Sequence, residues 1–278
     1  MKIQRTGITE AILQFDMWLG DRPKFAHVEA EFINWLYSSS GWYDKTIRGS
    51  YFDIDTEAVK RSVVYQEWKH QFRQSLFDCD YLEIMLWNHW IDAYFPEKHG
   101  LYKEFVTSFQ AKDNSLNESS LLYNYWDHPE KMFPFLKGKV LVINPMAQLM
   151  VEQYDNAHLV YPDMPDFTLS TYSFPYCFFN GAEAPDKNGF ETLDRVFGEL
   201  PKDFDIALIS VGPYGCILAD RLHRLGKSVM TVGSGLPKLF AIEPKSTKPH
   251  WLGTIPKQYI PNNYRKIEGG RYWTGPNE

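Results

Sequence analysis

The chain has 278 residues, which is long enough for a full hydrophobic core. Its 29 basic and 35 acidic side chains give a formal net charge of -6 at pH 7, whereas a dedicated nucleic-acid binder usually has an excess of basic residues. No apolar run approaches the roughly 18 residues of a membrane span, and Glu10 and Asp16 interrupt the first apolar stretch, so we expect neither a membrane span nor a signal peptide. Three scattered cysteines, Cys79, Cys177 and Cys216, are too few for a disulfide framework or a zinc cluster, which indicates a protein of the reducing cytoplasm.

The first 137 residues are predicted to be mainly helical. Apolar residues at helical spacing predict a helix over residues 8–19 with Thr9 as its cap, ended by Gly20 and Pro23. Asp55 and Glu57 predict a second helix start, because a capping side chain and early acids both satisfy the first N–H groups of a helix. The other expectations for this half are an extended segment at 24–28, helices at 29–37 and 58–77, a buried strand or helix at 81–94, and a polar loop at 111–120.

The second half carries the pattern of a parallel α/β sheet. Residues 139–145 and 206–211 are nearly unbroken apolar runs, as expected for strands that are buried on both faces. From Asp205 to Gly235 the chain reads as strand, glycine turn, helix, glycine stop, second strand and second glycine turn, which has the size of a βαβ unit. The other expectations are helices at 146–154 and 189–200, an irregular excursion at 161–188 that moves on ligand binding, and no periodic structure after 244.

Strands that alternate with helices predict an α/β fold with a Rossmann-like, mostly parallel sheet flanked by helices. We expect one domain over residues 1–278, in which a helical half of about residues 1–137 packs against a Rossmann-like half of about residues 138–278. Ligands of such sheets bind outside the carboxyl ends of the strands, so we expect the functional site at that edge.

Several segments together resemble the GT-D-type glycosyltransferase-like proteins of bacterial and viral surface-glycan clusters. They are GKVLVINP followed by Gln153-Tyr154, DIALISVGPYG, LGKSVMTVGSGLPKLFAI and the closing IEGGRYW, and the resemblance extends from Gly138 to Trp273. The family also carries an Arg-x-Gly-x-x-Glu pattern near its start. In KFAHVE, Lys24, Ala26 and Glu29 stand in the corresponding places, and His27 stands where relatives have a metal-binding Asp.

The resemblance implies a transferase that moves a sugar from a nucleotide-diphosphate donor, such as a UDP- or GDP-sugar, to a glycan hydroxyl in polysaccharide biosynthesis. It also implies Mn²⁺ or Mg²⁺, although His27 in place of Asp leaves metal dependence open. The resemblance implies a cytoplasmic location, which would be the host cytoplasm if the protein is viral. A non-catalytic nucleotide-sugar or glycan-binding protein is the alternative, favoured by Lys24 and Ala26 in the places of Arg and Gly. A methyltransferase or dehydrogenase has less support, because no Gly-x-Gly-x-x-Gly follows the first apolar strand.

A donor site is predicted where three apolar strands end. Glycine turns leave backbone N–H groups uncovered, and the start of a helix adds free donors and a positive dipole end, so both suit a diphosphate. Lys238 would add a point cation, unless it is a solvated lysine, and the amide of Asn144 would bind a base, ribose or phosphate. Tight turns without a ligand are the alternative. The predicted donor residues are Asn144, Gly212, Pro213, Tyr214, Gly215, Gly233, Ser234, Gly235 and Lys238.

Glu29 is the first choice for the chemistry. Glycosyl transfer needs a carboxylate that deprotonates the acceptor hydroxyl or holds a metal, and Glu29 has the position that the resemblance assigns. An ordinary acid at a helix start is the alternative. His27 would share a strand face with Glu29 as a second base or as a satisfied polar residue, and Lys24 would lie beside them.

Further candidates are acidic triplets and the closing signature. Asp53 and Asp55 form an Asp-x-Asp triplet that suits a metal, although helix capping also explains it, whereas the triplets at 78–80 and 203–205 are expected to be structural. Glu268, Tyr272 and Trp273 would contact the ligand by a carboxylate and by stacking, or would belong to a terminal strap over the core.

Overall fold

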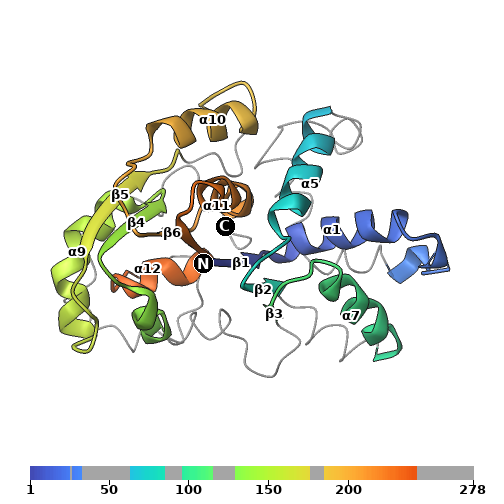
Figure 1. Ribbon diagram of the computed structural model, residues 1–278, viewed down its shortest axis with the longest axis horizontal. Helices are drawn as coiled ribbons and strands as arrows, with labels where there is room; N and C mark the ends of the chain where they lie inside the picture. The colour runs from blue at the N-terminus through green and yellow to red at the C-terminus, as the bar shows by residue number, and fades with distance from the viewer. Residues whose placement is uncertain (26, 33–62, 85–95, 115–128, 176–184, 243–278) are drawn as a thin grey trace, which may run out of the picture.

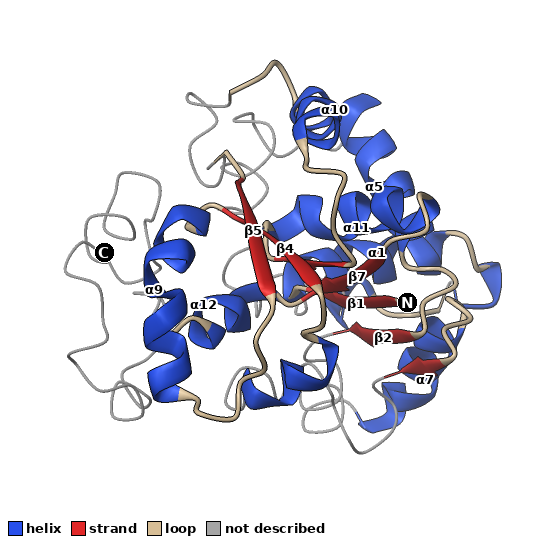
Figure 2. Ribbon diagram, turned by 60° about the vertical axis from the view of Figure 1, so that its left-hand side comes forward, coloured by secondary structure: helices blue, strands red, loops and turns tan. Residues whose placement is uncertain are grey.

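The structure is a computed structural model that describes residues 1–25, 27–32, 63–84, 96–114, 129–175 and 185–242. Its centre is a seven-stranded sheet in which every neighbouring pair is parallel, in the order β3-β2-β1-β7-β6-β4-β5 (Figure 2). The strands are β1 Lys2–Thr6, β2 Tyr81–Ile84, β3 Asp113–Asn114, β4 Lys139–Asn144, β5 Thr168–Ser173, β6 Ile206–Ile209 and β7 Ser228–Thr231. The expected Rossmann-like α/β fold is therefore confirmed.

The described helices flank this sheet (Figure 1). They are α1 Ile8–Gly20, α5 Val63–Ser75, α7 His99–Thr107, α9 Ala147–Val160, α10 Gly189–Glu199, α11 Gly215–Arg224 and α12 Leu236–Leu239. Short 3-10 segments are η1 Pro23–Phe25, η3 Pro96–Lys98, η4 Pro129–Phe135, η6 Gly212–Tyr214 and η7 Gly233–Gly235. Within the described ranges, no helix combines the length and apolar character that crossing a bilayer demands.

Two apolar clusters show which helices cover which face of the sheet. One cluster joins α1, α5, α7, α10 and α11 to one face, called face A, and the other joins α9, α12 and η4 to the opposite face, called face B. Face A is aromatic where α1 meets α7: the rings of Phe15 and Phe105 are 5.3 Å apart, and those of Trp18 and Phe105 are 5.8 Å apart. The high aromatic content of the chain thus serves core packing to a large extent.

The handedness of the connections explains this division. Crossovers between parallel strands are right-handed, so connections that move across the sheet in one direction place their helices on one face. The steps from β1 through β2 to β3, and from β5 through β6 to β7, all move in the same direction and use face A. The step from β4 to β5 moves the opposite way, and its helix α9 lies on face B.

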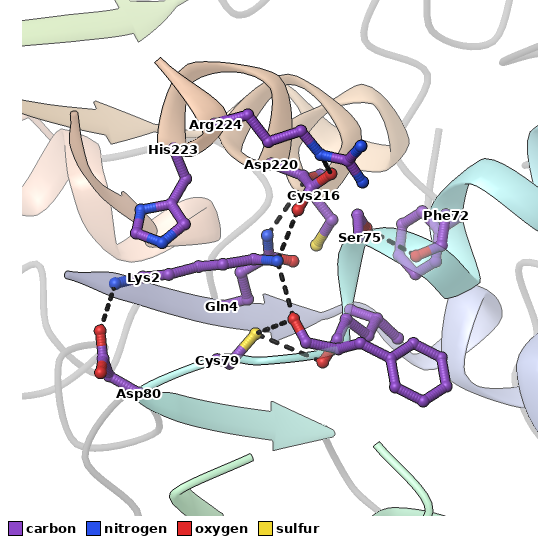
Figure 3. Close-up of polar contacts among 12 residues, drawn as sticks. Lys2, Gln4, Phe72, Ser75, Cys79, Asp80, Cys216, Asp220, His223 and Arg224 are labelled. Atoms are coloured by element: carbon purple, nitrogen blue, oxygen red, sulfur yellow. Dashed lines mark hydrogen bonds and ion pairs between the residues drawn. The ribbon is translucent and has the colours of Figure 1, made fainter. Parts of the chain in front are cut away.

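The N-terminal half differs from the expectation of a helical half, because it supplies β1, β2 and β3 to the same sheet. Strand β1 carries polar side chains that are buried, and the structure shows their partners on α11 (Figure 3). The Lys2 ammonium forms an ion pair with Asp220 at 2.6 Å, and the Gln4 amide donates to the Cys216 carbonyl at 3.2 Å. Because these partners lie more than 200 residues away in the sequence, local periodicity does not reveal the strand.

Other local predictions are also corrected. Residues 23–25 form η1 and a turn follows, so the extended segment at 24–28 is wrong. Helix α1 begins after Gly7 without a side-chain cap, so Thr9 is not its cap. Strand β3 lies within the predicted loop at 111–120, and β5 lies within the predicted excursion at 161–188. Since β5 pairs with β4 over six residues, that part of the excursion is a fixed sheet strand rather than a moving lid.

Candidate functional site

The carboxyl ends of β4, β6, β7 and β1 meet at one edge of the sheet, where the chain leaves toward alternating faces. Strands β4 and β7 continue into α9 and α12 on face B, whereas β6 and β1 continue into α11 and α1 on face A. Ligands of open α/β sheets bind where connections from adjacent strands diverge in this way. The structure therefore brings Asn144 and both glycine turns to one edge, as the sequence predicts.

The turn after β6 offers fewer donors than expected. Pro213 has no backbone N–H, and the N–H of Gly215 is bonded to the Gly212 carbonyl. The Pro213 carbonyl accepts from the Trp68 indole of α5 at 3.4 Å. Gly212, with φ +55°, is the exposed residue of η6 and remains the point where this turn meets solvent.

Tyr214 acts in packing. Its side chain is buried, and its ring centroid lies 5.4 Å from that of Phe174. A Cβ at Gly189 would lie 2.7 Å from the Tyr214 ring, so Gly189 leaves the space that this ring fills. The contacts place the Tyr214 side chain in the core between η6 and the start of α10.

In the turn after β7, the side chain of Arg5 lies so close to Gly233 that it fills the space a Cβ would need. Gly233 has φ +68°, and a Cβ there would lie 1.8 Å from Nη1 of Arg5. The same Nη1 donates to the Val232 carbonyl at 2.9 Å. The guanidinium of Arg5 therefore rests on the backbone of this turn, which explains Gly233 without a ligand. Gly235 ends η7, and Ser234 lies within it.

Lys238 and Asn144 are both buried and form hydrogen bonds with other parts of the protein. Lys238 is 3 % exposed in α12, so it is not a solvated lysine, and its carbonyl accepts from the Tyr161 hydroxyl at 3.2 Å. The Asn144 amide donates to the Ser210 carbonyl at 2.9 Å, and its oxygen accepts from the Met146 N–H at 2.8 Å. Asn144 thus ties the end of β4 to the end of β6 and holds the edge together.

A charged group at the end of β1 was missed by the sequence reasoning. Arg5 is anchored on both sides: its N–H donates to the Thr231 hydroxyl at 2.7 Å, and its carbonyl accepts from the Cys216 thiol at 3.3 Å. Glu10 is buried in the first turn of α1, and its carboxylate lies over Gly7, where a Cβ would be 2.3 Å from Oε2. Burial raises the pKa of Glu10, against the opposing effects of its own backbone N–H and of Arg5.

The signal that would have found this group stands in the sequence. Arg5, Gly7 and Glu10 follow the Arg-x-Gly-x-x-Glu spacing without a substitution, whereas the segment at 24–29 matches it only at Glu29. These three residues span the junction of β1 and α1 at the candidate edge.

Strand β2 adds a second buried carboxylate near Arg5. Glu83 is 3 % exposed and is in register with Arg5 on the adjacent strand, so both side chains are on face B. Burial lowers the pKa of Arg5, and the nearby charges of Glu83 and then Glu10 oppose this shift. In the sequence, the only indication of this buried carboxylate is one acidic residue in the otherwise apolar segment YLEI.

The residues first chosen for catalysis lie elsewhere. Lys24, His27 and Glu29 are exposed beyond the end of α1, and Lys24 pairs with Glu104 at 2.6 Å. A helix of 13 residues is about 20 Å long, so α1 carries this segment away from the glycine turns (Figure 1). With η1 in place of a strand, His27 and Glu29 do not share a strand face. The structure therefore does not bring Lys24, His27 and Glu29 together with the glycine turns.

The acidic triplets at the amino ends of strands are structural, as expected. Asp80 accepts from the Lys2 N–H and pairs with Lys112, and Asp205 accepts from the Lys139 N–H. Among the described residues, no group of three or more His, Cys, Asp or Glu side chains is arranged to hold a metal ion. Five predicted site residues lie outside the described residues: Asp53, Asp55, Glu268, Tyr272 and Trp273.

Comparison of the chain with protein-family models, curated proteins and solved structures yields no match. The assignment of a function therefore depends on the geometry of this edge and on the residues that form it.

Proposed function

We propose that the protein is a glycosyltransferase that moves a sugar from a nucleoside-diphosphate donor to a glycan hydroxyl, with Glu10 in the role first given to Glu29. One observation carries the proposal. Arg5, Gly7 and Glu10 have the spacing of the family that the chain resembles, and they lie at the carboxyl end of β1, next to the Gly233 turn. This arrangement supports a single site that the pattern and the glycine turns form together.

Glu10 has properties that suit a general base. A carboxylate is most effective as a base when its pKa approaches the working pH, and burial raises the pKa of Glu10 in that direction. In the proposed reaction it accepts the proton of the acceptor hydroxyl, the new glycosidic bond forms, and the bond from the anomeric carbon to the diphosphate breaks. The electron pair of that bond leaves with the nucleoside diphosphate.

The charge of the leaving diphosphate needs compensation. Ile8 stands two residues before Glu10, where the resemblance puts the metal-binding Asp, and an apolar side chain does not coordinate a metal. We assign the compensation to the Arg5 guanidinium and to the first turns of α1 and α11, since cations and helix N-termini stabilise phosphate charge.

The test is a screen of nucleotide sugars and nucleoside diphosphates, with and without Mn²⁺, by thermal shift and by release of nucleoside diphosphate. A ligand at a hundred times its Kd stabilises the fold by about 2.7 kcal/mol. Loss of a general base lowers turnover by about 10²- to 10⁴-fold, so Glu10→Gln should bind the donor and turn it over at least a hundredfold more slowly.

Glu29→Gln is the matched control, because it removes an exposed carboxylate beyond the far end of α1. It should keep wild-type turnover. Equal turnover by Glu10→Gln and wild type would contradict the proposal. Donor binding without turnover in the wild type would instead support the non-catalytic binding protein. If no nucleotide stabilises the fold, both the transferase hypothesis and the binding-protein hypothesis fail.

A further inference from the structure

Thr6, the last residue of β1, has a buried hydroxyl that is not satisfied. The residue is 1 % exposed, and its Oγ1 has no hydrogen-bond partner within the described structure. Buried polar side chains nearly always have a partner. An unpartnered hydroxyl at the candidate edge therefore points to a group that binds there.

The alternation of β1 determines where this hydroxyl points. Lys2 and Gln4 point to face A, where they contact Asp220 and then the Cys216 carbonyl, nearer the start of α11 (Figure 3). Side chains two residues apart point to the same face of a strand. Thr6 is the next in this series, so it faces the start of α11, where η6 and its exposed Gly212 lie.

The first turn of α1 begins two residues after Thr6, at Ile8. Gly7 caps this helix of 13 residues without a side-chain hydrogen bond, and the Glu10 carboxylate binds its own backbone N–H. The first N–H groups of an α-helix have no acceptor within the helix itself. They form the positive end of the helix. The Thr6 hydroxyl and the first N–H groups of α1 are thus close to one another along the chain, at the junction of β1 and α1.

We propose that the Thr6 hydroxyl and the first N–H groups of α1 bind the oxygens of a phosphate group. Donors without acceptors select an anion with several acceptor oxygens, and phosphate at the start of a helix has this chemistry. The positive charge of Arg5 acts to lower the pKa of Glu10, against the larger effect of burial. The identification of this phosphate with the donor diphosphate rests on the proposed function, whereas the phosphate subsite does not.

The probe is inorganic pyrophosphate, titrated calorimetrically against sodium chloride of matched ionic strength. Thr6→Val replaces the hydroxyl by a methyl group of the same size. Because a hydrogen bond to a charged group is lost, we expect the Kd for pyrophosphate to rise about tenfold or more. Thr6→Ser keeps the hydroxyl and should bind within about threefold of wild type.

Ser75→Ala is the matched control, because Ser75 is a buried hydroxyl that donates to the Phe72 carbonyl at 2.6 Å, next to the amino end of β2. It should bind pyrophosphate as wild type does. Without ligand, the melting temperature of Thr6→Val should equal or exceed that of wild type, since an unpartnered buried hydroxyl is removed. The melting temperature of Ser75→Ala should fall. The opposite effects of the two variants on the melting temperature distinguish a hydroxyl that binds a ligand from one that stabilises the fold.

Wild-type affinity in Thr6→Val, or no pyrophosphate binding by the wild type, would overturn the subsite. Should Thr6→Val not fold, Thr6→Ala provides the same comparison. If pyrophosphate binding depends on Thr6 but no nucleoside diphosphate binds, the subsite stands and the proposed function fails. If a nucleoside diphosphate binds equally to wild type and Thr6→Val, the subsite fails and the proposed function stands.

Discussion

Two glycines and two charged residues constrain one another at the end of β1. Gly7 leaves room for the Glu10 carboxylate, and Gly233 leaves room for the Arg5 guanidinium. Any side chain at Gly233 would also need a positive φ, which costs a non-glycine residue about 1–3 kcal/mol. The positions of these two charged groups therefore depend on the backbone at the end of β1 and on the backbone of the turn after β7. Both glycines are thus explained by the packing of protein side chains, without a ligand.

The raised pKa of Glu10 makes a prediction about stability and pH. A carboxyl whose pKa is raised on folding contributes stability that is complete below its unfolded pKa and is lost as pH rises through its folded pKa. Glu10→Gln does not titrate. Its stability relative to wild type should therefore increase as pH rises from about 4 to about 7.

Urea denaturation of both proteins across that range measures the difference in the free energy of unfolding. Glu29→Gln controls for the loss of an exposed carboxylate. A relative stability of Glu10→Gln that instead grows on acidification would contradict the burial of this carboxyl.

At the scale of elements, β1 is held in the sheet by polar contacts to α11 and to the turn before β2. The Lys2 ammonium pairs with Asp220 and also donates to the Phe77 carbonyl at 2.8 Å. The side chains of Lys2 and Asp220 are 3 % and 13 % exposed, respectively. One buried ammonium thus connects three segments that are distant in the sequence.

Lys2→Met should therefore be strongly destabilising. Removal of one partner of a buried pair leaves the other uncompensated and costs about 3–5 kcal/mol. Because Arg224 still pairs with Asp220 at 2.8 Å, we expect about 3 kcal/mol. Lys139→Met breaks the exposed pair with Asp203 and should cost less than about 1 kcal/mol. Chemical denaturation of the two variants checks this order, and equal losses would disagree with it.

At the scale of the whole molecule, two buried thiols report on global opening. Cys79 precedes β2 and Cys216 lies in the first turn of α11, on either side of the polar side chains of β1 (Figure 3). Burial raises the pKa of Cys79 to about 12 and raises the pKa of Cys216 as well. The thiolate is the reactive form of cysteine, so both sites should be inert in the folded protein.

Alkylation with iodoacetamide, followed by mass spectrometry of each site, tests this expectation. Because alkylation is slow compared with refolding, both sites should be labelled at their unfolded-chain rate multiplied by the fraction of unfolded protein. Labelling of either site that is faster than this product would show a local opening between β1 and α11. The same measurement in urea provides the reference for the unfolded chain.

Local sequence determines most of the C-terminal half, with the exception of β5. Strands β4 and β6 are buried on both faces, so their apolar runs identify them without knowledge of their neighbours. Helices α9, α10 and α11 follow from their own periodicity, and the glycine turns after β6 and β7 follow from composition. Their common edge was predictable because parallel strands all end on the same side.

The tertiary structure alone decided the strands of the N-terminal half and the charged group of the site, whereas helices α1 and α5 follow from local sequence. Lys2, Gln4 and Glu83 look like surface residues in the sequence, but they are buried. Lys2 pairs with Asp220 and the Gln4 amide donates to the Cys216 carbonyl, both on another element. Periodicity records how a segment buries its own apolar face, whereas the meeting of Arg5 with Glu83 and Gly233 depends on the strand order. That order results from the direction and handedness of the crossovers, which no local pattern contains.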